Sequence, residues 1–192
     1  MEQQAKKIYT PKEYLELEAA SETKHEYFGG EIFAMSGGGY NHALIGTNLL
    51  IALGNRLKGK PCRPLGSDAR IYTPSGFYTY PDAVVIFGKP EFVPAETHAP
   101  TQTITNPALI AEVLSESTRN YDKGGKFDLY RAIPSFTDYL LIEQDRIQLS
   151  HFRKTANGEW ILHDYKPDDK NVVIDSLQLE LDIAELYDGV EF

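Results

Sequence analysis

The strongest constraint on this chain is the stretch ALIAEVLSEST, residues 108 to 118, in which one carboxylate interrupts an apolar run. Its composition predicts a buried strand from about Ala108 to Leu114, with Glu112 inside it. Burying an ionised carboxylate costs several kcal/mol unless a cation compensates it. The fold must therefore bring a metal ion or a basic side chain close to Glu112.

A second acid begins another buried run. Asp82 follows Pro81 directly and precedes the apolar string AVVIF. Two acids on adjacent strands, with a backbone carbonyl beside them, would suit Mg²⁺, which commonly uses one or two carboxylates together with phosphates and water. The alternative is structural: Asp82 closes a turn, and Glu112 pairs with a lysine or arginine.

Three cations follow Glu112 at helical spacing. Arg119, Lys123 and Lys126 are separated by four and three residues, which predicts one common helix face. A lysine there could neutralise a scissile phosphate or help to orient an attacking water. Alternatively, Lys126 could form a surface ion pair with Asp122, which would contribute only about 0.3 to 0.5 kcal/mol to stability. The residues alone leave both readings open.

The remaining pattern predicts an α/β fold with a mixed central sheet flanked by helices. In the first half we expect a short helix with Thr10 as N-cap, a hairpin around Gly29 and Gly30, a long helix capped by Asn41, and a hairpin through PSG whose second arm ends in AVVIF. A proline-bearing loop over 88–107 follows. The second half predicts a helix from about Asp122, a buried strand in SFTDYLLIEQD, a hairpin over 146–165, and an apolar C-terminal extension.

Composition narrows the classes of protein. At 192 residues and 42% hydrophobic content, one domain over 1–192 is expected. The net charge of -9 disfavours tight nonspecific binding of duplex DNA unless a local basic patch or bound cation receives it. A single cysteine and an N-terminus without an apolar core predict a cytoplasmic protein. No apolar stretch reaches the ~20 residues that span a bilayer, so no membrane partner is expected.

Several other motifs carry weaker signals. SGGGYNHALIG lacks the Gly-Lys-Ser/Thr ending of a phosphate loop and is interpreted as a flexible connection. His42 at the start of the long helix could face a substrate or help to cap the helix, and we favour the cap. The histidines at 25, 42, 98, 151 and 163 show no zinc spacing. Aromatic residues over 72–80 fit strand packing better than base stacking.

The segments PDAVVI, AEVLSEST and YDKGGKFDLYRAIPSFTDYLLIE, in this order and spacing, resemble the Uma-two family within the PD-(D/E)XK nuclease superfamily. The similarity covers nearly the whole chain. It implies a restriction-endonuclease-like fold with a mixed four-stranded central sheet, and hydrolysis of DNA phosphodiesters assisted by Mg²⁺ or Mn²⁺. By position, Asp82 and Glu112 would be the metal carboxylates, and the Val113 carbonyl a further ligand.

The chain departs from the superfamily pattern at one position. The acid-x-Lys signature would place a lysine at 114, where this chain has Leu114. In similar proteins the lysine is found on the following helix, which nominates Lys126. Glu26 resembles the N-terminal acid of some superfamily members, although it could also be a surface charge at a strand end.

Two other functions stay open from the sequence. The first is a non-enzymatic binding or assembly module that keeps the fold, with Leu114 as the trace of lost catalysis. The second is a metal-free acid/base pair of Asp82 and Glu112, as in glycoside hydrolysis. The C-terminal segment VVIDSLQLELDIAELY could support a homodimer or could cover its own core.

Overall fold

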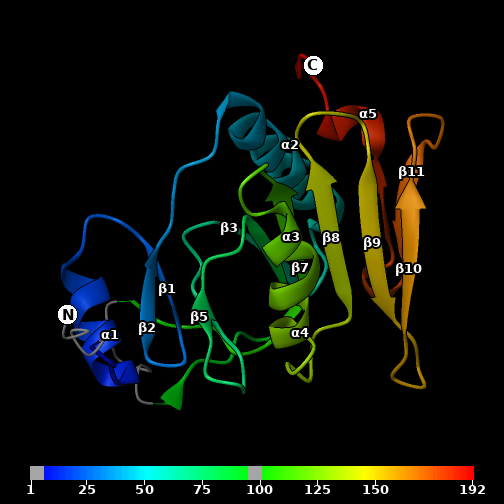
Figure 1. Cartoon of the computed structure of the whole chain (residues 1–192). Helices are drawn as coiled ribbons and strands as arrows, with labels where there is room; N and C mark the ends of the chain where they lie inside the picture. The colour runs from blue at the N-terminus through cyan, green and yellow to red at the C-terminus, as the bar shows by residue number, and fades with distance from the viewer. Residues whose placement is uncertain (1–6, 95–100) are drawn as a thin grey trace.

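A computed structural model describes residues 7–94 and 101–192 and is built around a six-stranded sheet. Its strand order is β10-β9-β8-β7-β6-β3 (Figure 1). All neighbouring pairs are antiparallel except β7 and β8, which are parallel. The sheet comprises β3 (Cys62–Gly66), β6 (Ala83–Phe87), β7 (Pro107–Leu114), β8 (Asp138–Glu143), β9 (Leu149–Lys154) and β10 (Trp160–Tyr165).

The parallel pair explains why a helix lies between β7 and β8 in the chain. Parallel neighbours need a crossover, and this one runs through α3 (Arg119–Tyr121), η2 (Asp122–Lys126) and α4 (Phe127–Tyr130). Figure 1 shows these three segments as one continuous helical stretch in front of the sheet. The middle segment η2 is a π-helical turn. The helix expected from Asp122 is therefore confirmed, with an irregular centre.

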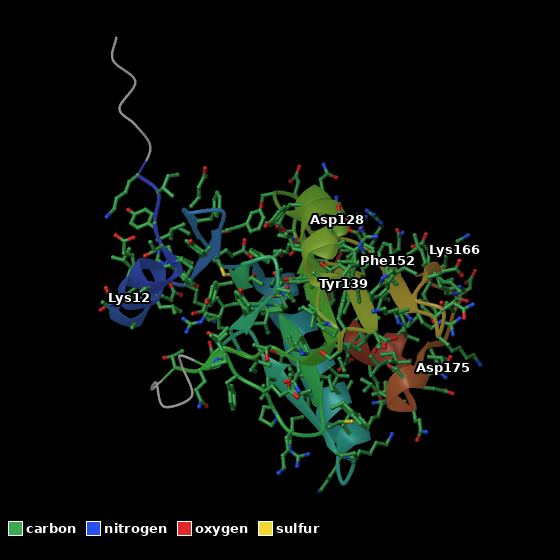
Figure 2. All side chains as sticks on the ribbon, turned by 90° about the horizontal axis from the view of Figure 1, so that it is seen from below. Lys12, Asp128, Tyr139, Phe152, Lys166 and Asp175 are labelled. Carbon is green, nitrogen blue, oxygen red and sulfur yellow. The ribbon has the colours of Figure 1, made fainter. Side chains whose placement is uncertain are left out.

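Each face of the sheet packs against its own hydrophobic cluster. Under the crossover helix, the Phe127 ring lies 5.7 Å from Tyr139 and 4.5 Å from Phe152. Figure 2 shows Tyr139 and Phe152 beside the helix that carries Asp128. The opposite face is covered by α2 (Tyr40–Leu57) and by the C-terminal elements β11 (Asn171–Ile174), η3 (Asp175–Leu177), β12 (Leu179–Asp182) and α5 (Ile183–Leu186). The predicted mixed α/β fold with a C-terminal extension is confirmed.

A second sheet, β2-β1-β5-β4, stands beside the first and carries the N-terminal helix. The expected capping box is present, because Thr10 and Glu13 exchange their hydrogen bonds at the start of α1. The hairpin turn uses Gly29 and Gly30 at φ of 60° and 87°, values that glycine adopts without strain. The elements are α1 (Pro11–Ala20), β1 (His25–Phe28), β2 (Glu31–Ala34), β4 (Ile71–Tyr72) and β5 (Tyr78–Thr79).

Three details differ from the sequence-based expectations. The N-cap of α2 is Gly39, and Asn41 lies inside the helix, where its amide donates to the Glu191 carbonyl at 2.8 Å. The hairpin through PSG ends at Thr79, and AVVIF forms β6 in the other sheet, because Pro81 interrupts the run. The strand β3 was not expected, since a proline lies within it; it is an edge strand, where proline is tolerated.

The loop over 88–107 is partly paired. Phe92 and Ile104 form an antiparallel bridge, and Ile104 also bridges Ile71. Residues 95–100, including His98 and Pro100, lie outside the described residues. Among the described residues, no helix combines the length and the apolar character needed to cross a bilayer.

Candidate functional site

The sheet brings Asp82 and Glu112 together. The antiparallel register pairs Ala83 with Ala111, so its continuation places Asp82 opposite Glu112. Two hydrogen bonds tie the pair: the Val113 N–H donates to Oδ2 of Asp82 at 2.7 Å, and the Asp82 N–H donates to Oε2 of Glu112 at 3.3 Å. Each carboxylate is thus oriented by the other strand's backbone.

The Val113 carbonyl faces the same side. In a β-strand the N–H and C=O of one residue point to the same edge, and the Val113 N–H points to Asp82. Besides the Asp82 carboxylate, the Val113 backbone also contributes to the raised pKa of His42. Two carboxylates and one carbonyl therefore converge at this end of the sheet.

Glu112 is buried, with 4% of its surface exposed. Its Oε1 accepts a hydrogen bond from the Tyr130 hydroxyl at 2.8 Å and from the Lys126 ammonium at 3.2 Å. Burial raises the pKa of Glu112 to about 8, the Lys126 ammonium opposes the shift, and the Asp82 carboxylate adds to it. Near neutral pH a proton occupies this site unless another cation replaces it.

Lys126 is enclosed by carboxylates and is 6% exposed. Its ammonium lies 3.2 Å from an oxygen of each of three acids, which are Glu26, Glu112 and Asp122. Burial opposes the charged form, but these carboxylates together hold the pKa of Lys126 well above its ordinary value. The buried Oδ1 of Asp122 has no hydrogen bond and faces only this ammonium among the described residues.

Glu26 comes into the site from β1 and is 8% exposed, so it is not a surface charge at a strand end. The Thr79 hydroxyl donates to its Oε1 at 2.5 Å, and Lys126 contacts the same oxygen. All five predicted site residues therefore meet in one region. Arg119 and Lys123 do not, because both pair with Glu143.

The π-turn explains this separation. A regular helix would place Arg119, Lys123 and Lys126 on one face, but Lys123 and Lys126 both lie within the π-turn, whose wider i→i+5 winding changes the angle between their side chains. Gly125 is needed within the turn, since a Cβ there would lie 2.9 Å from the Tyr121 ring. Lys126 consequently points to Glu112 while Lys123 points away.

His42 also belongs to the site, and its expected capping role is wrong because α2 has no side-chain cap. Its Nε2 lies 3.3 Å from Oδ2 of Asp82. This hydrogen bond raises the pKa of His42, and burial opposes the rise. Gly38 permits the position, because a Cβ at residue 38 would lie 2.4 Å from the His42 ring.

The donor set fits a hard divalent cation. Among the described residues no three His, Cys, Asp or Glu side chains form a ready group around an ion. Two carboxylates and a carbonyl nevertheless match the protein share of a Mg²⁺ site, in which water and phosphate complete the shell. Three acids, namely Glu26, Glu112 and Asp122, contact Lys126, and a fourth acid, Asp82, adjoins Glu112, so their summed charge also favours an added cation.

The model of the Uma2 family, described as "Putative restriction endonuclease", matches residues 11–184. The chain belongs to the Uma2 family. The family resemblance recognised in the sequence is thus confirmed over most of its length.

Two further proteins resemble most of the chain. Uncharacterized protein slr1290 of Synechocystis sp. is 37% identical over 184 residues, which cover 95% of this chain and 93% of the relative. Uncharacterized protein sll1609 of the same organism is 38% identical over 157 residues, covering 81% and 86%.

A solved structure supports the fold. The crystal structure of a putative nuclease belonging to DUF820 from Anabaena variabilis superposes with a TM-score of 0.72 at 18% identity. The superposition covers 94% of this chain and 98% of the neighbour. At this identity the likeness shows the fold alone.

Sequence reasoning missed two contributors to this candidate site and favoured a different role for a third, His42. Asp122 was expected only as a surface partner, and the role of Tyr130 was not foreseen. The signal for Tyr130 was present, because it lies four residues after Lys126, at the spacing of neighbours on a helix face. No comparable signal pointed from His42 to Asp82, since that contact joins separate elements.

Proposed function

We propose that this protein is a metal-dependent endonuclease that hydrolyses DNA phosphodiesters with Mg²⁺ or Mn²⁺. One observation carries the proposal: Asp82 and Glu112 are fixed together by reciprocal backbone hydrogen bonds, with Lys126 3.2 Å from Glu112. Family membership supports the same chemistry, because the family is described as putative restriction endonucleases.

Each residue has a distinct task in this proposal. Asp82, Glu112 and the Val113 carbonyl would hold the cation. A divalent ion bound there would supply activation of water and stabilisation of the charge on phosphorus. Within the described residues Oδ1 of Asp82 accepts no hydrogen bond, so this oxygen is available to a ligand. His42 and the Val113 N–H fix the other oxygen.

Lys126 and its neighbours provide electrostatic support. The Lys126 ammonium places a fixed positive charge beside Glu112 and stabilises negative charge that develops on the phosphate, an effect that preorganised groups exert without reorganising. Glu26 and Asp122 hold the ammonium in place. Tyr130 orients the Glu112 carboxyl group through its hydrogen bond to Oε1.

The binding-module alternative has one observation in its favour. Lys126 contacts three carboxylates and is 6% exposed, so its charge is already compensated within the protein. A site of this kind could hold an ion without performing hydrolysis. Measuring ion binding and cleavage separately distinguishes the two functions.

The test is calorimetric titration with Mn²⁺ and Mg²⁺, followed by cleavage of plasmid and oligonucleotide DNA. Glu112→Gln and Asp82→Asn should lose both ion binding and cleavage. Glu116→Gln is the matched control for Glu112→Gln, because Glu116 follows on the same segment but is exposed. Ion binding without cleavage in the wild type would support the module instead. Cleavage that persists in both site variants would refute the proposal.

A further inference from the structure

A larger cavity opens beside the proposed ion site. It has a volume of about 470 Å³ and runs from Asp82 and His42 along one side of α2. A smaller cavity of about 150 Å³, lined by Glu112 and Lys126, shares His42 and Asp82 with it. The two cavities therefore adjoin each other at Asp82 and His42.

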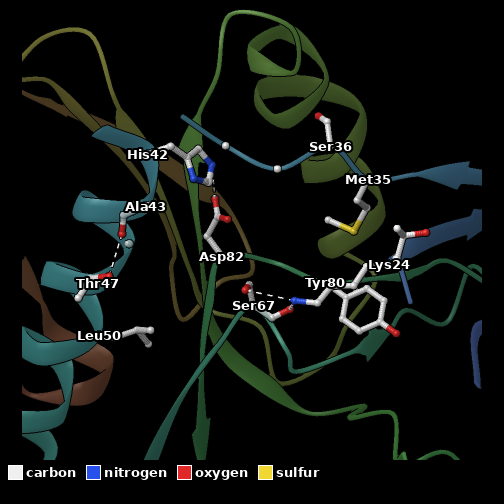
Figure 3. Close-up of a pocket in the computed structure, with 14 residues that line it drawn as sticks. Lys24, Met35, Ser36, His42, Ala43, Thr47, Leu50, Ser67, Tyr80 and Asp82 are labelled. Carbon is white, nitrogen blue, oxygen red and sulfur yellow. Dashed lines mark hydrogen bonds and ion pairs between the residues drawn. The ribbon is translucent and has the colours of Figure 1, made fainter. Parts of the chain in front are cut away.

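The larger cavity has two unlike walls. One wall is the helix α2, which contributes Ala43, Gly46, Thr47 and Leu50. Figure 3 shows Met35, Lys24 and Tyr80 on the opposite side, with Asp82 and His42 at the end between the walls. Small side chains on the helix keep this space open. A Cβ added at Gly46 would meet no atom within 4 Å.

We propose that this cavity receives one unpaired nucleotide of a single-stranded nucleic acid, next to the phosphodiester that is cut. The inference rests on the proposed function and adds the class of substrate. The base would enter between α2 and the wall of Met35 and Tyr80, and its phosphate would lie toward Asp82. A volume of about 470 Å³ falls within the ~300 to 1,000 Å³ of small-ligand sites.

The charges favour a single strand over a duplex. Lys24 is the only lysine or arginine among the described residues that line the larger cavity, and it already pairs with Asp68 at 2.7 Å. Tight duplex binding commonly uses about 6 to 10 phosphate contacts. A base within a duplex also cannot enter such a cavity without leaving its stack. The net charge of -9 leaves little general attraction for a duplex.

The cavity can be filled without disturbing the core. Gly46→Phe places a ring in the open space of the cavity. Gly54→Phe is the matched control, because Gly54 lies on the same helix, is exposed, has nothing within 4 Å of an added Cβ, and does not line the cavity. Thermal unfolding checks that both variants fold. If Gly46→Phe does not fold, Thr47→Phe fills the cavity from a neighbouring exposed position.

The experiment measures fluorescence anisotropy of a labelled single strand and of the same sequence as a duplex, with Ca²⁺ replacing Mg²⁺. Wild type and Gly54→Phe should bind the single strand more tightly than the duplex, with a salt slope of about 1 to 2. Gly46→Phe should weaken single-strand binding by about tenfold or more, which corresponds to ~1.4 kcal/mol. Single-strand binding that Gly46→Phe leaves intact, a preference for duplex, or no binding would each overturn the inference.

Mn²⁺ titration of the same variants separates this inference from the proposed function. Gly46→Phe should bind Mn²⁺ like the wild type, because the ring lies outside the carboxylate pair. Wild-type Mn²⁺ binding and duplex cleavage together with failed single-strand binding would overturn only the substrate class. Absence of both ion binding and cleavage would overturn the proposed function as well.

Discussion

The ammonium of Lys126 lies 3.2 Å from Oε1 of Glu112, although the lysine comes from a helix and the acid from a strand. Strand side chains alternate, so Leu114 shares the face of Glu112. Leu114 is 1% exposed and packs in the cluster beneath the crossover helix. A lysine from that helix therefore reaches Glu112 while position 114 contributes to the core.

Lys126→Met should destabilise the protein and reduce cleavage. It leaves three buried acids without their cation, which should lower the free energy of unfolding by about 3 to 5 kcal/mol. Loss of a preorganised charge should reduce the cleavage rate by about 10²- to 10³-fold. Urea unfolding and cleavage assays measure the two effects.

Lys123→Met is the control for this variant. Its side chain is 38% exposed and pairs with Glu143, so its removal should change stability by no more than about 1 kcal/mol and leave cleavage intact. Equal cleavage by Lys126→Met and wild type would exclude Lys126 from the chemistry.

The stability of the metal-free protein should fall as pH rises from 5 toward 9. Glu112 has a pKa of about 8 when folded and about 4.5 as its ordinary value, so the folded state binds the extra proton between them. This contribution is fully present below the lower pKa and is lost as pH rises through the upper one. His42, with its raised pKa, acts in the same direction.

Comparing wild type with Glu112→Gln isolates the Glu112 contribution, because His42 is kept in both. Unfolding midpoints in EDTA, measured across this pH range, should show a shallower slope in the variant. Identical slopes would mean that Glu112 titrates near its ordinary pKa.

Two glycines in the π-turn should respond differently to alanine. Gly125→Ala places a Cβ 2.9 Å from the Tyr121 ring, which must move, so the position of Lys126 should be disturbed and cleavage should fall. Gly124→Ala meets nothing within 4 Å and should stabilise the helix by up to about 1 kcal/mol. Unfolding and cleavage are measured for both. A fall of equal size in both variants would contradict the role given to the Tyr121 contact.

Asp138→Asn should destabilise the fold without affecting the ion site. Asp138 is fully buried, lies 2.8 Å from Nε2 of His151, and accepts a hydrogen bond from Ser176 in the C-terminal extension. Losing this charge should cost about 3 to 5 kcal/mol, measured by urea unfolding. Asp175→Asn, at an exposed ion pair with Arg153, should cost less than about 1 kcal/mol. Mn²⁺ affinity should stay unchanged in both; a shift in Asp138→Asn would show that the extension influences the site.

Local patterns singled out Asp82 and Glu112, because a carboxylate in or beside an apolar strand is conspicuous in any sequence. The capping box at Thr10 and the buried strand around Glu112 follow from short-range rules and are confirmed. The sequence could not show which cation turns toward Glu112. Regular helical spacing puts Lys123 and Lys126 on one face, and only the π-turn, which spacing does not reveal, separates them.

Contacts between elements that are distant in the sequence could not be predicted either, because residue spacing carries no information about them. His42 at the start of α2 meets Asp82 directly before β6, and its position depends on the missing side chain at Gly38. Glu26 enters from the second sheet, and no spacing rule relates it to Lys126. The roles of these residues in ion binding and cleavage stay predictions until the variants are tested.

Reciprocal hydrogen bonds join Asp82 to the strand of Glu112. The distance between the two carboxylates is therefore set by the pairing of the two strands and not by the surrounding loops. Residues 35–37, which precede Gly38, could then diversify without changing the affinity for the ion. Exchanging that segment between distant family members should transfer the substrate preference. The dissociation constant of the ion should stay unchanged, because the sheet determines it.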